Sequence, residues 1–75
     1  MGMAQLRILS NTLTGREIEV LELMAEDMTA MQISAILEIS VRTVEQHRGS
    51  ALKKLGCRTH AGAIVKALRA GTIRL

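Results

Sequence analysis

The sequence predicts an all-α protein in which four helices form one small domain containing a helix-turn-helix. Three observations lead to this expectation. The chain of 75 residues contains no proline, its apolar residues recur at a spacing of three to four, and threonine, serine and glycine divide it at short intervals. A chain of this length has room for a single hydrophobic core.

The first helix is expected to begin after Thr14 and to end near Asp27. Thr14 and Glu17 have the spacing of a capping box, in which each side chain binds the backbone N–H of the other residue. Leu13 lies where a hydrophobic staple would pack against the first turns. The apolar stripe expected to face the core comprises Val20, Leu21, Met24 and Ala25.

A second, short helix is expected to follow, because Thr29 and Gln32 repeat the capping box. Ser40 is the next N-cap candidate, so this helix has to end within about two and a half turns. The side chains expected to point inward from it are Ile33, Ile36 and Leu37. Three methionines, Met24, Met28 and Met31, are expected to fill gaps in a core that lacks aromatic residues.

The third helix, expected over residues 41–55 and ended by Gly56, has two chemically different faces. At about 100° per residue, the core side comprises Val41, Val44, Ala51, Leu52 and Leu55, with His47 at its edge. The opposite side collects Arg42, Glu45, Gln46, Gly49 and Lys53, with Thr43 and Ser50 at its margin. Such a polar, partly basic helix fits the major groove of DNA, where Arg and Gln can bind purine edges and Glu can accept a hydrogen bond from cytosine.

A fourth helix is expected over about residues 60–70, with Thr59 as its cap and Gly71 at its end. Residues 1–11 have no clear helical period apart from a short apolar stretch, and we expect them to be an arm, a linker or an added start. The domain itself is therefore expected to span residues 12–75.

Charge is divided unevenly along the chain, whose formal net charge is +3. Residues 1–39 hold two arginines and six acidic residues, a net of −4, whereas residues 40–75 hold eight lysines and arginines and one acidic residue, a net of +7. An acidic half and a basic half are typical of a protein that turns one side toward nucleic acid. Because no Phe, Tyr or Trp is available to stack on unpaired bases, the expected nucleic acid is a duplex.

Other classes of function are disfavoured by the residues present. The longest apolar run is far shorter than the roughly 20 residues that span a bilayer, and the lone cysteine suits a reducing compartment, so we expect a soluble, cytoplasmic protein with no membrane partner. Cys57, His60 and His47 lack a fourth ligand for a zinc site. The serines and histidines lack the pattern of a catalytic triad. We therefore expect no metal, no cofactor, no catalytic residue and no enzymatic activity.

The motifs also resemble, in order and separation, those of a known family. They are Leu13-Thr14-x-Arg16-Glu17-x-Glu19-Val20-Leu21, Ile33-Ser34-x-x-Leu37-x-Ile39-Ser40, Thr43-Val44-x-x-His47 and Lys54-Leu55-Gly56. Over about residues 12–73 the chain resembles the LuxR-type (GerE-like) helix-turn-helix family of bacterial transcription regulators. The resemblance implies a DNA-binding domain whose third helix enters the major groove and whose fourth helix pairs two copies on a two-fold related site.

The resemblance further implies which residues contact DNA. It places Glu45, Gln46 and Gly49 against bases. It places Thr29, Ala30, Arg42, Thr43, Ser50, Lys53 and Lys54 against the DNA backbone. Many members carry an Asn-Lys pair at positions 30 and 31 and a basic residue at position 45, so the base sequence that relatives recognise does not transfer to this chain.

The fourth helix carries more apolar residues than one buried stripe requires. The residues expected to form a homodimer interface are Ala61, Ile64, Val65 and Leu68. Double-stranded DNA is the expected partner, and RNA polymerase is a further expected partner of a regulator. The alternative is a small helical interaction module that binds another protein through this apolar face, with an incidental basic face.

Overall fold

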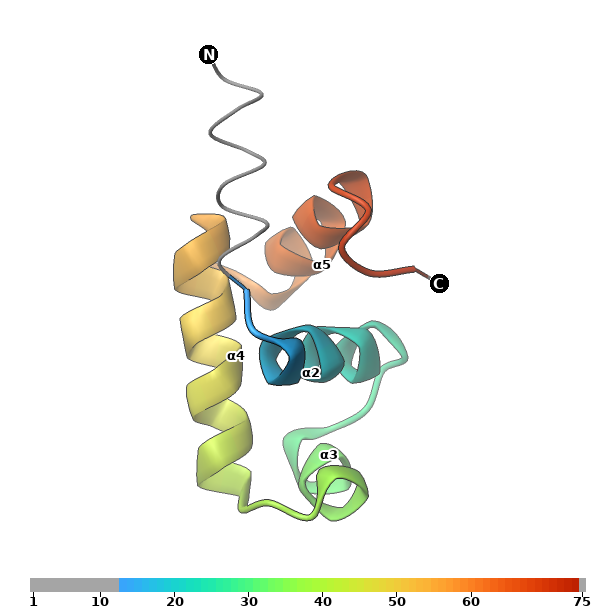
Figure 1. The fold of residues 1–75 in the computed structure, drawn as a ribbon, viewed down its shortest axis with the longest axis vertical. Coiled ribbons are helices and arrows are strands. Elements are labelled where there is room, and N and C mark those ends of the chain that lie inside the picture. The colour runs from blue at the N-terminus through green and yellow to red at the C-terminus, as the bar shows by residue number, and fades with distance from the viewer. Residues whose placement is uncertain (1–12, 75) are drawn as a thin grey trace.

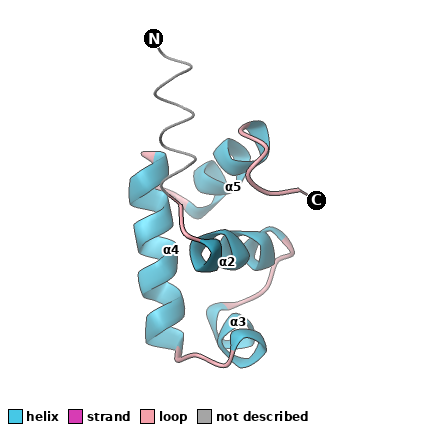
Figure 2. Ribbon diagram, viewed as in Figure 1, coloured by secondary structure: helices cyan, strands magenta, loops and turns pink. Residues whose placement is uncertain are grey.

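The computed structural model describes residues 13–74, within which the chain forms four α-helices (Figure 1). They are α2 (Gly15–Ala25), α3 (Ala30–Leu37), α4 (Val41–Leu55) and α5 (His60–Arg69). Between residues 13 and 74 only helices and loops occur (Figure 2), which confirms the expected all-α fold. The expected arm at residues 1–11 lies outside the described residues.

The first two helices begin with the capping boxes that the sequence predicts. The Thr14 hydroxyl accepts the Glu17 backbone N–H at 3.1 Å, and the Glu17 carboxylate accepts the Thr14 backbone N–H at 2.8 Å. Thr29 and Gln32 make the same pair of bonds at 3.1 and 2.9 Å. Each box therefore satisfies two backbone donors that a helix start would leave unpaired.

The last two helices have simpler hydroxyl caps. Ser40 accepts the backbone N–H of Thr43, and Thr59 accepts that of Gly62, each at 3.0 Å. An N-cap hydroxyl stabilises a helix by about 1 kcal/mol. All four helix starts are thus determined by side chains within three residues of the cap, which explains why the sequence alone predicts them.

The helix ends are less obvious in the sequence than the starts. Gly56 ends α4 in the left-handed conformation at φ 70°, as expected. Two residues with side chains adopt the same conformation, Asp27 after α2 at φ 64° and Glu38 after α3 at φ 58°. Glu38 forms the tight turn of the helix-turn-helix, where its backbone N–H binds the carbonyl oxygen of Ser34.

The core lies between α4 and the other three helices. In Figure 1, α4 runs along one side of the molecule and α2, α3 and α5 pack against its other side. The buried apolar side chains are Leu13, Val20, Leu21, Met24, Ile33, Val44, Ala51, Leu55, Ala63, Ala67 and Ile73. Each helix contributes at least one of them, and the three alanines are completely buried, which lets α4 and α5 approach the other helices closely.

Three apolar residues expected to face the core do not. Met31 is 73% exposed and Ile36 is 50% exposed, and Val41 is only half-buried. At about 100° per residue, Ile33 defines the inward direction of α3, so Met31 lies on the opposite side and Ile36 at the edge. The sequence interpretation was wrong for Met31 and Ile36 because the two turns of α3 are too few to determine which side is buried. Val41 is the first residue of α4, whose buried side begins at Val44.

One core residue was not foreseen. After Gly71, at φ 73°, the chain turns back and buries Ile73, which is 2% exposed. The segment that follows α5 therefore belongs to the core, although it has no regular secondary structure.

Replacing Glu38 with glycine should stabilise the protein. The left-handed conformation costs a residue with a Cβ about 1–2 kcal/mol. Glycine avoids this cost, but part of the gain in stability is lost because glycine has more conformational entropy in the unfolded chain. We expect Glu38→Gly to raise the free energy of unfolding by about 0.5–1 kcal/mol, measured by urea denaturation. Glu38→Ala, which removes the carboxylate but keeps the Cβ, is the matched control; an equal gain from it would contradict this explanation.

Candidate nucleic-acid interface

One side of α4 faces away from the other helices (Figure 1), and its side chains are polar and exposed. It consists of the exposed residues Arg42, Glu45, Gln46, Gly49 and Lys53. Val44, Ala51 and Leu55 hold the opposite side of α4 in the core. With 15 residues, α4 is about 22 Å long, and the outward stripe from Arg42 to Lys53 extends over about three turns of it.

Gly49 lies in the middle of the outward stripe. A Cβ built at this position would meet nothing within 4 Å. Packing within the described chain therefore does not explain why glycine is here, although glycine inside a helix costs about 1 kcal/mol relative to alanine. The missing side chain leaves a shallow place on the stripe, flanked by Gln46 and Lys53.

The beginning of α4 carries a small hydroxyl pair. The hydroxyls of Ser40 and Thr43 lie 2.8 Å apart, and Ser40 also caps the helix through the Thr43 backbone N–H. Arg42 is exposed beside them. This end of α4 therefore presents hydroxyls and one guanidinium, groups that commonly bind phosphate oxygens.

The beginning of α3 holds the two other residues expected at the DNA backbone. Thr29 is exposed, and its hydroxyl is occupied by the capping box. Ala30 is half-buried and packs against the core. The start of α3 can bind a phosphate through its backbone N–H groups and the positive end of the helix dipole.

Ser50 and Lys54 differ from the other expected backbone contacts, because their polar atoms face inward. The Lys54 ammonium lies 2.9 and 3.2 Å from the two carboxylate oxygens of Glu17, and the Ser50 hydroxyl is a hydrogen-bond partner of the same carboxylate. The Glu17 side chain is only 5% exposed and that of Lys54 is 31% exposed. These contacts tie the first turn of α2 to the second half of α4.

The same contacts control the ionisation of Glu17. Burial by itself raises the pKa of this carboxyl. The hydrogen bonds from the Ser50 hydroxyl, the Thr14 backbone N–H and the Lys54 ammonium, together with the Lys54 charge, outweigh burial and lower the pKa from 4.5 to about 2. Glu17 is therefore a buried carboxylate that remains charged and fully paired.

Sequence reasoning assigned Glu17 only to the capping box and missed this contact. The partners are separated by 37 positions, so no local spacing connects them. One sign was available: Ser50 and Lys54 are one turn apart beside Ala51, which places both at the margin of the buried stripe rather than on the outward one.

The outward side of α5 is apolar. Ala61 is exposed, Val65 is 46% exposed, and Ile64 and Leu68 are half-buried. Ala63 and Ala67 are the fully buried residues of this helix, and Ile64 and Leu68 also pack against the core with part of their surface. Ala61 and Val65 are therefore the apolar side chains of this helix that are exposed, and Ile64 and Leu68 lie partly in the core beside them. Lys66 has a structural contact, since its ammonium donates to the Leu55 carbonyl oxygen at 3.0 Å and so satisfies the end of α4.

Within residues 13–74, no three His, Cys, Asp or Glu side chains gather as a metal site would require. None of the helices in that range has the length and apolar character needed to cross a lipid bilayer.

The sequence of the chain is similar to those of known proteins. The family described as "Bacterial regulatory proteins, luxR family" matches residues 11–67. The chain is 43% identical over 63 residues to the spore germination protein GerE of Bacillus subtilis, covering 84% of this chain and 85% of GerE. It is 46% identical over 65 residues to RpaR of Rhodopseudomonas palustris, an HTH-type quorum sensing-dependent transcriptional regulator, covering 87% of this chain and 27% of RpaR. The chain thus spans most of GerE but about a quarter of RpaR.

The fold agrees with a solved structure of the same kind. The structure of the transcription factor GerE superposes on this chain with a TM-score of 0.80 at 39% sequence identity, covering 83% of this chain and 92% of the other. The similarity therefore extends over sequence, helix order and three-dimensional arrangement.

Removing the cation that pairs with Glu17 should destabilise the fold. We expect Lys54→Met to lower the free energy of unfolding at pH 7 by about 1–3 kcal/mol, because a buried carboxylate loses a charged partner. In the unchanged protein, Glu17 titrates at about 2 when folded and near 4.5 when unfolded. Its contribution, about 3 kcal/mol, is complete above about pH 5 and is lost as the pH falls toward 2.

Urea denaturation at several pH values measures both effects. Lys53→Met is the matched control, because Lys53 is the exposed neighbour of Lys54, and we expect it to change stability by less than about 0.5 kcal/mol. Equal losses from the two variants, or a stability that does not vary between pH 5 and pH 2, would contradict the role given to Glu17.

Proposed function

Because this chain belongs to the luxR family of bacterial regulatory proteins, we propose that it binds specific duplex DNA sequences as a homodimer, with α4 in the major groove. The family consists of DNA-binding transcription regulators and not of enzymes. The position of α4 in the groove, the contact residues and the dimer are part of this proposal.

The observation that carries the proposal is the outward stripe of α4. The major groove is about 12 Å wide and admits one α-helix. α4 is the longest described helix, and no described helix covers its outward side (Figure 1). The stripe combines long polar side chains with the open position at Gly49, where a Cβ would meet nothing, so it can approach the floor of the groove closely.

Three residues of the stripe are proposed to contact bases. Gln46 can bind an adenine edge through two hydrogen bonds, and Glu45 can accept from the amino group of cytosine. Gly49 offers no side chain, and its proposed role is to let the bases approach the helix backbone. Because Glu45 is acidic, it also disfavours any register that would place it beside a phosphate.

The proposed backbone contacts fall into two groups. Arg42, Thr43 and Lys53, together with the N–H groups at the Thr29–Ala30 start of α3, contact phosphates directly. Ser50 and Lys54 act through Glu17, because their polar atoms already bind its carboxylate. We propose that they position α4 at the DNA backbone rather than bind phosphate as independent groups.

The outward side of α5 is the proposed dimer interface. Ala61, Ile64, Val65 and Leu68 are accessible there, and a two-fold symmetric contact buries the same patch on both copies. Two copies would place two α4 helices on half-sites about one helical turn of DNA apart. The apolar character of the patch and the exposure of Ala61 and Val65 support this use.

Residues 12–75 form the DNA-binding unit, preceded by the segment 1–11. A regulator of this kind acts in the bacterial cytoplasm, with RNA polymerase as a further partner.

Substitutions on α4 should separate backbone contacts from base contacts. A duplex selected from a randomised pool serves as the ligand for fluorescence anisotropy at several salt concentrations. Arg42→Ala and Lys53→Ala should each weaken binding to every sequence and reduce the slope of log K against log salt by about 1. Gln46→Ala should keep the slope and lose about 1–3 kcal/mol of discrimination at one base pair.

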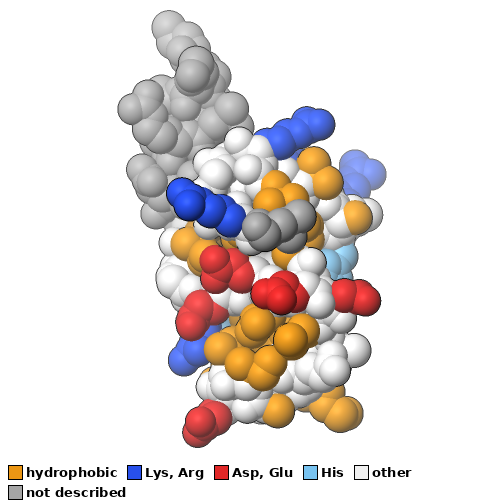
Figure 3. Space-filling model, turned by 90° about the vertical axis from the view of Figure 1, so that its right-hand side faces the viewer, with side chains coloured by type: hydrophobic (Ala, Val, Ile, Leu, Met, Phe, Trp, Pro, Cys, Tyr) orange, Lys and Arg blue, Asp and Glu red, His pale blue; other side chains and the backbone are white. Residues whose placement is uncertain are grey.

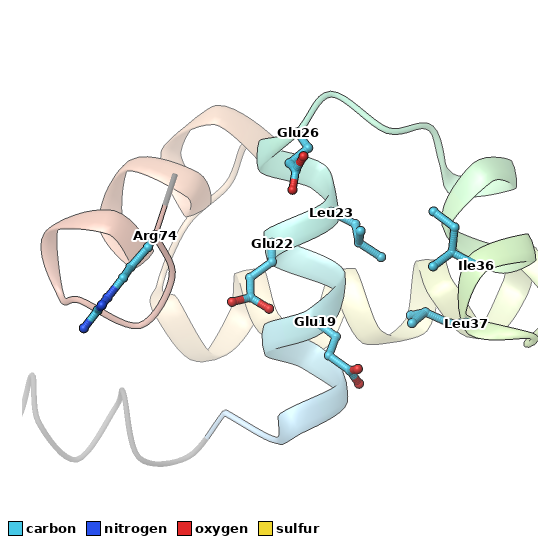
Figure 4. Close-up of a pocket in the computed structure, with 7 residues that line it drawn as sticks. All are labelled: Glu19, Glu22, Leu23, Glu26, Ile36, Leu37 and Arg74. Atoms are coloured by element: carbon cyan, nitrogen blue, oxygen red, sulfur yellow. The ribbon is translucent and has the colours of Figure 1, made fainter.

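Arg74→Ala is the matched control, because Arg74 is exposed and lies on the side of the molecule away from α4 (Figures 1 and 4). It should change neither quantity appreciably. Equal effects of Arg74→Ala and Arg42→Ala would argue against α4 as the DNA-contacting helix, and binding with no dependence on sequence would argue against base recognition.

A charge on the outward side of α5 should dissociate the dimer. Val65 is 46% exposed, so Val65→Glu leaves the core intact while it places a carboxylate in an apolar interface. We expect a monomer in sedimentation equilibrium and a roughly tenfold or greater loss of affinity for a two-fold symmetric site. Met31→Glu, at an exposed methionine of α3, is the control.

Two outcomes would contradict the dimer proposal. If Val65→Glu remains as associated as the unchanged protein, the interface lies elsewhere. If the unchanged protein is a monomer that fails to select any duplex, the apolar side of α5 serves another protein, as the interaction-module alternative requires.

A further inference from the structure

A second surface with its own chemistry lies on the side of the molecule away from α4. Figure 3 shows this side, where acidic side chains form a band and hydrophobic side chains gather next to it. A hollow of about 380 Å³ opens here between α2 and α3. We call it the α2–α3 groove; its lining residues are Glu19, Glu22, Leu23, Glu26, Ile36, Leu37 and Arg74.

The floor of the groove is apolar and comes from two helices. Leu23 of α2 points toward α3, where Ile36 and Leu37 face it (Figure 4). Leu23 and Leu37 are half-buried and pack against the core, whereas Ile36 is 50% exposed. An isoleucine left half in water beside other apolar side chains can gain free energy by being covered.

The rim of the groove is acidic and regularly spaced. Glu19, Glu22 and Glu26 are all exposed and follow one edge of α2 at intervals of three and four residues, the spacing of one helical face. From Glu19 to Glu26 the rise along the helix is about 10 Å. Arg16 is paired with Glu19 at 3.3 Å, and Arg74 lies at the end of the groove nearest α5 (Figure 4).

We propose that the α2–α3 groove docks a basic amphipathic helix of another protein. An apolar floor between two helices accepts side chains spaced at i, i+3, i+4 and i+7. Lysines or arginines repeating every three to four residues along the same helix match the carboxylates of the rim over the same distance of about 10 Å. The acidic rim repels phosphate, so a nucleic acid does not fit this surface.

The groove and the outward stripe of α4 lie on opposite sides of the molecule (Figures 1 and 3). A chain that holds DNA through α4 would therefore keep the groove open to a protein partner. Simultaneous binding of DNA and partner rests on the proposed function, whereas docking into the groove does not require DNA. The small floor fits a transient contact, below the roughly 1,200 Å² that stable interfaces bury.

The test is an NMR titration of the isotope-labelled full chain with a synthetic peptide. The peptide is about four turns long, with leucines at i, i+3, i+4 and i+7 and lysines at the other positions. A second peptide has the same composition in an order that gives no leucine stripe. We expect amide shifts concentrated at residues 19–26 and 36–37 with the first peptide, and at least about fivefold weaker binding of the second.

Substitutions in the α2–α3 groove test whether the peptide binds there. Ile36→Ala should weaken peptide binding by about fivefold or more, and the double change Glu22→Gln with Glu26→Gln should weaken it at low salt, with a smaller effect as ionic strength rises. Met31→Ala is the matched control, because Met31 is an exposed apolar residue of α3 that does not line the groove. It should leave the affinity unchanged.

Three results would overturn the proposal. Equal binding of the two peptides would mean that charge attraction alone holds them, and amide shifts centred on α5 would place the site elsewhere. Amide shifts in the groove that depend on protein concentration without peptide would make a second copy of this chain the occupant. A selected duplex added to the peptide complex tests the other proposal separately. If the peptide affinity is unchanged when DNA is bound, the result supports both the docking groove and the proposed function. If the chain does not bind DNA but still binds the peptide in the groove, the result counts against the proposed function only.

Discussion

The arrangement of the outward surfaces depends on one buried carboxylate, that of Glu17. It closes the cap of α2 and at the same time binds Lys54 and Ser50 of α4, so the start of one helix is held to the second half of another. A buried charge must be paired to be tolerated, which makes this contact demanding in its geometry. With these two side chains turned inward, the rotation of α4 about its axis is fixed, and the stripe from Arg42 to Lys53 is the side left outward.

The apolar core stabilises the same helix arrangement as the Glu17 contact, because the helices pack close together. Ala51, Ala63 and Ala67 are fully buried, and small side chains at these positions allow short distances between helix axes. A core with no aromatic residue has limited apolar area in a chain of this size. The four hydroxyl caps, each worth about 1 kcal/mol, therefore form an appreciable part of a marginal stability. Polar contacts at the helix ends and packing at the helix centres support the same arrangement.

The charge division of the sequence has a spatial counterpart. Most acidic residues fall in the half of the chain that contains α2 and α3, and most basic residues in the half that contains α4 and α5. Because α4 lies on the opposite side of α2 from the α2–α3 groove (Figure 1), a separation along the chain becomes a separation between faces. Lys54 and Lys66 are exceptions that serve the structure, one at Glu17 and one at the end of α4. Counting basic residues therefore overstates the charge available to a polyanion.

The sequence by itself determined the number, type and starts of the helices, the ending of α4 at Gly56 and the outward polar stripe of α4, because caps, left-handed glycines and helical periodicity act within a few residues. It also pointed to the family. Only the tertiary structure decided that Ser50 and Lys54 face Glu17, that Met31 and Ile36 face outward, and that Ile73 completes the core. These features depend on how the two-turn α3, the margin of α4 and the segment after α5 meet residues far away in the chain. Local spacing carries no information about such distant contacts.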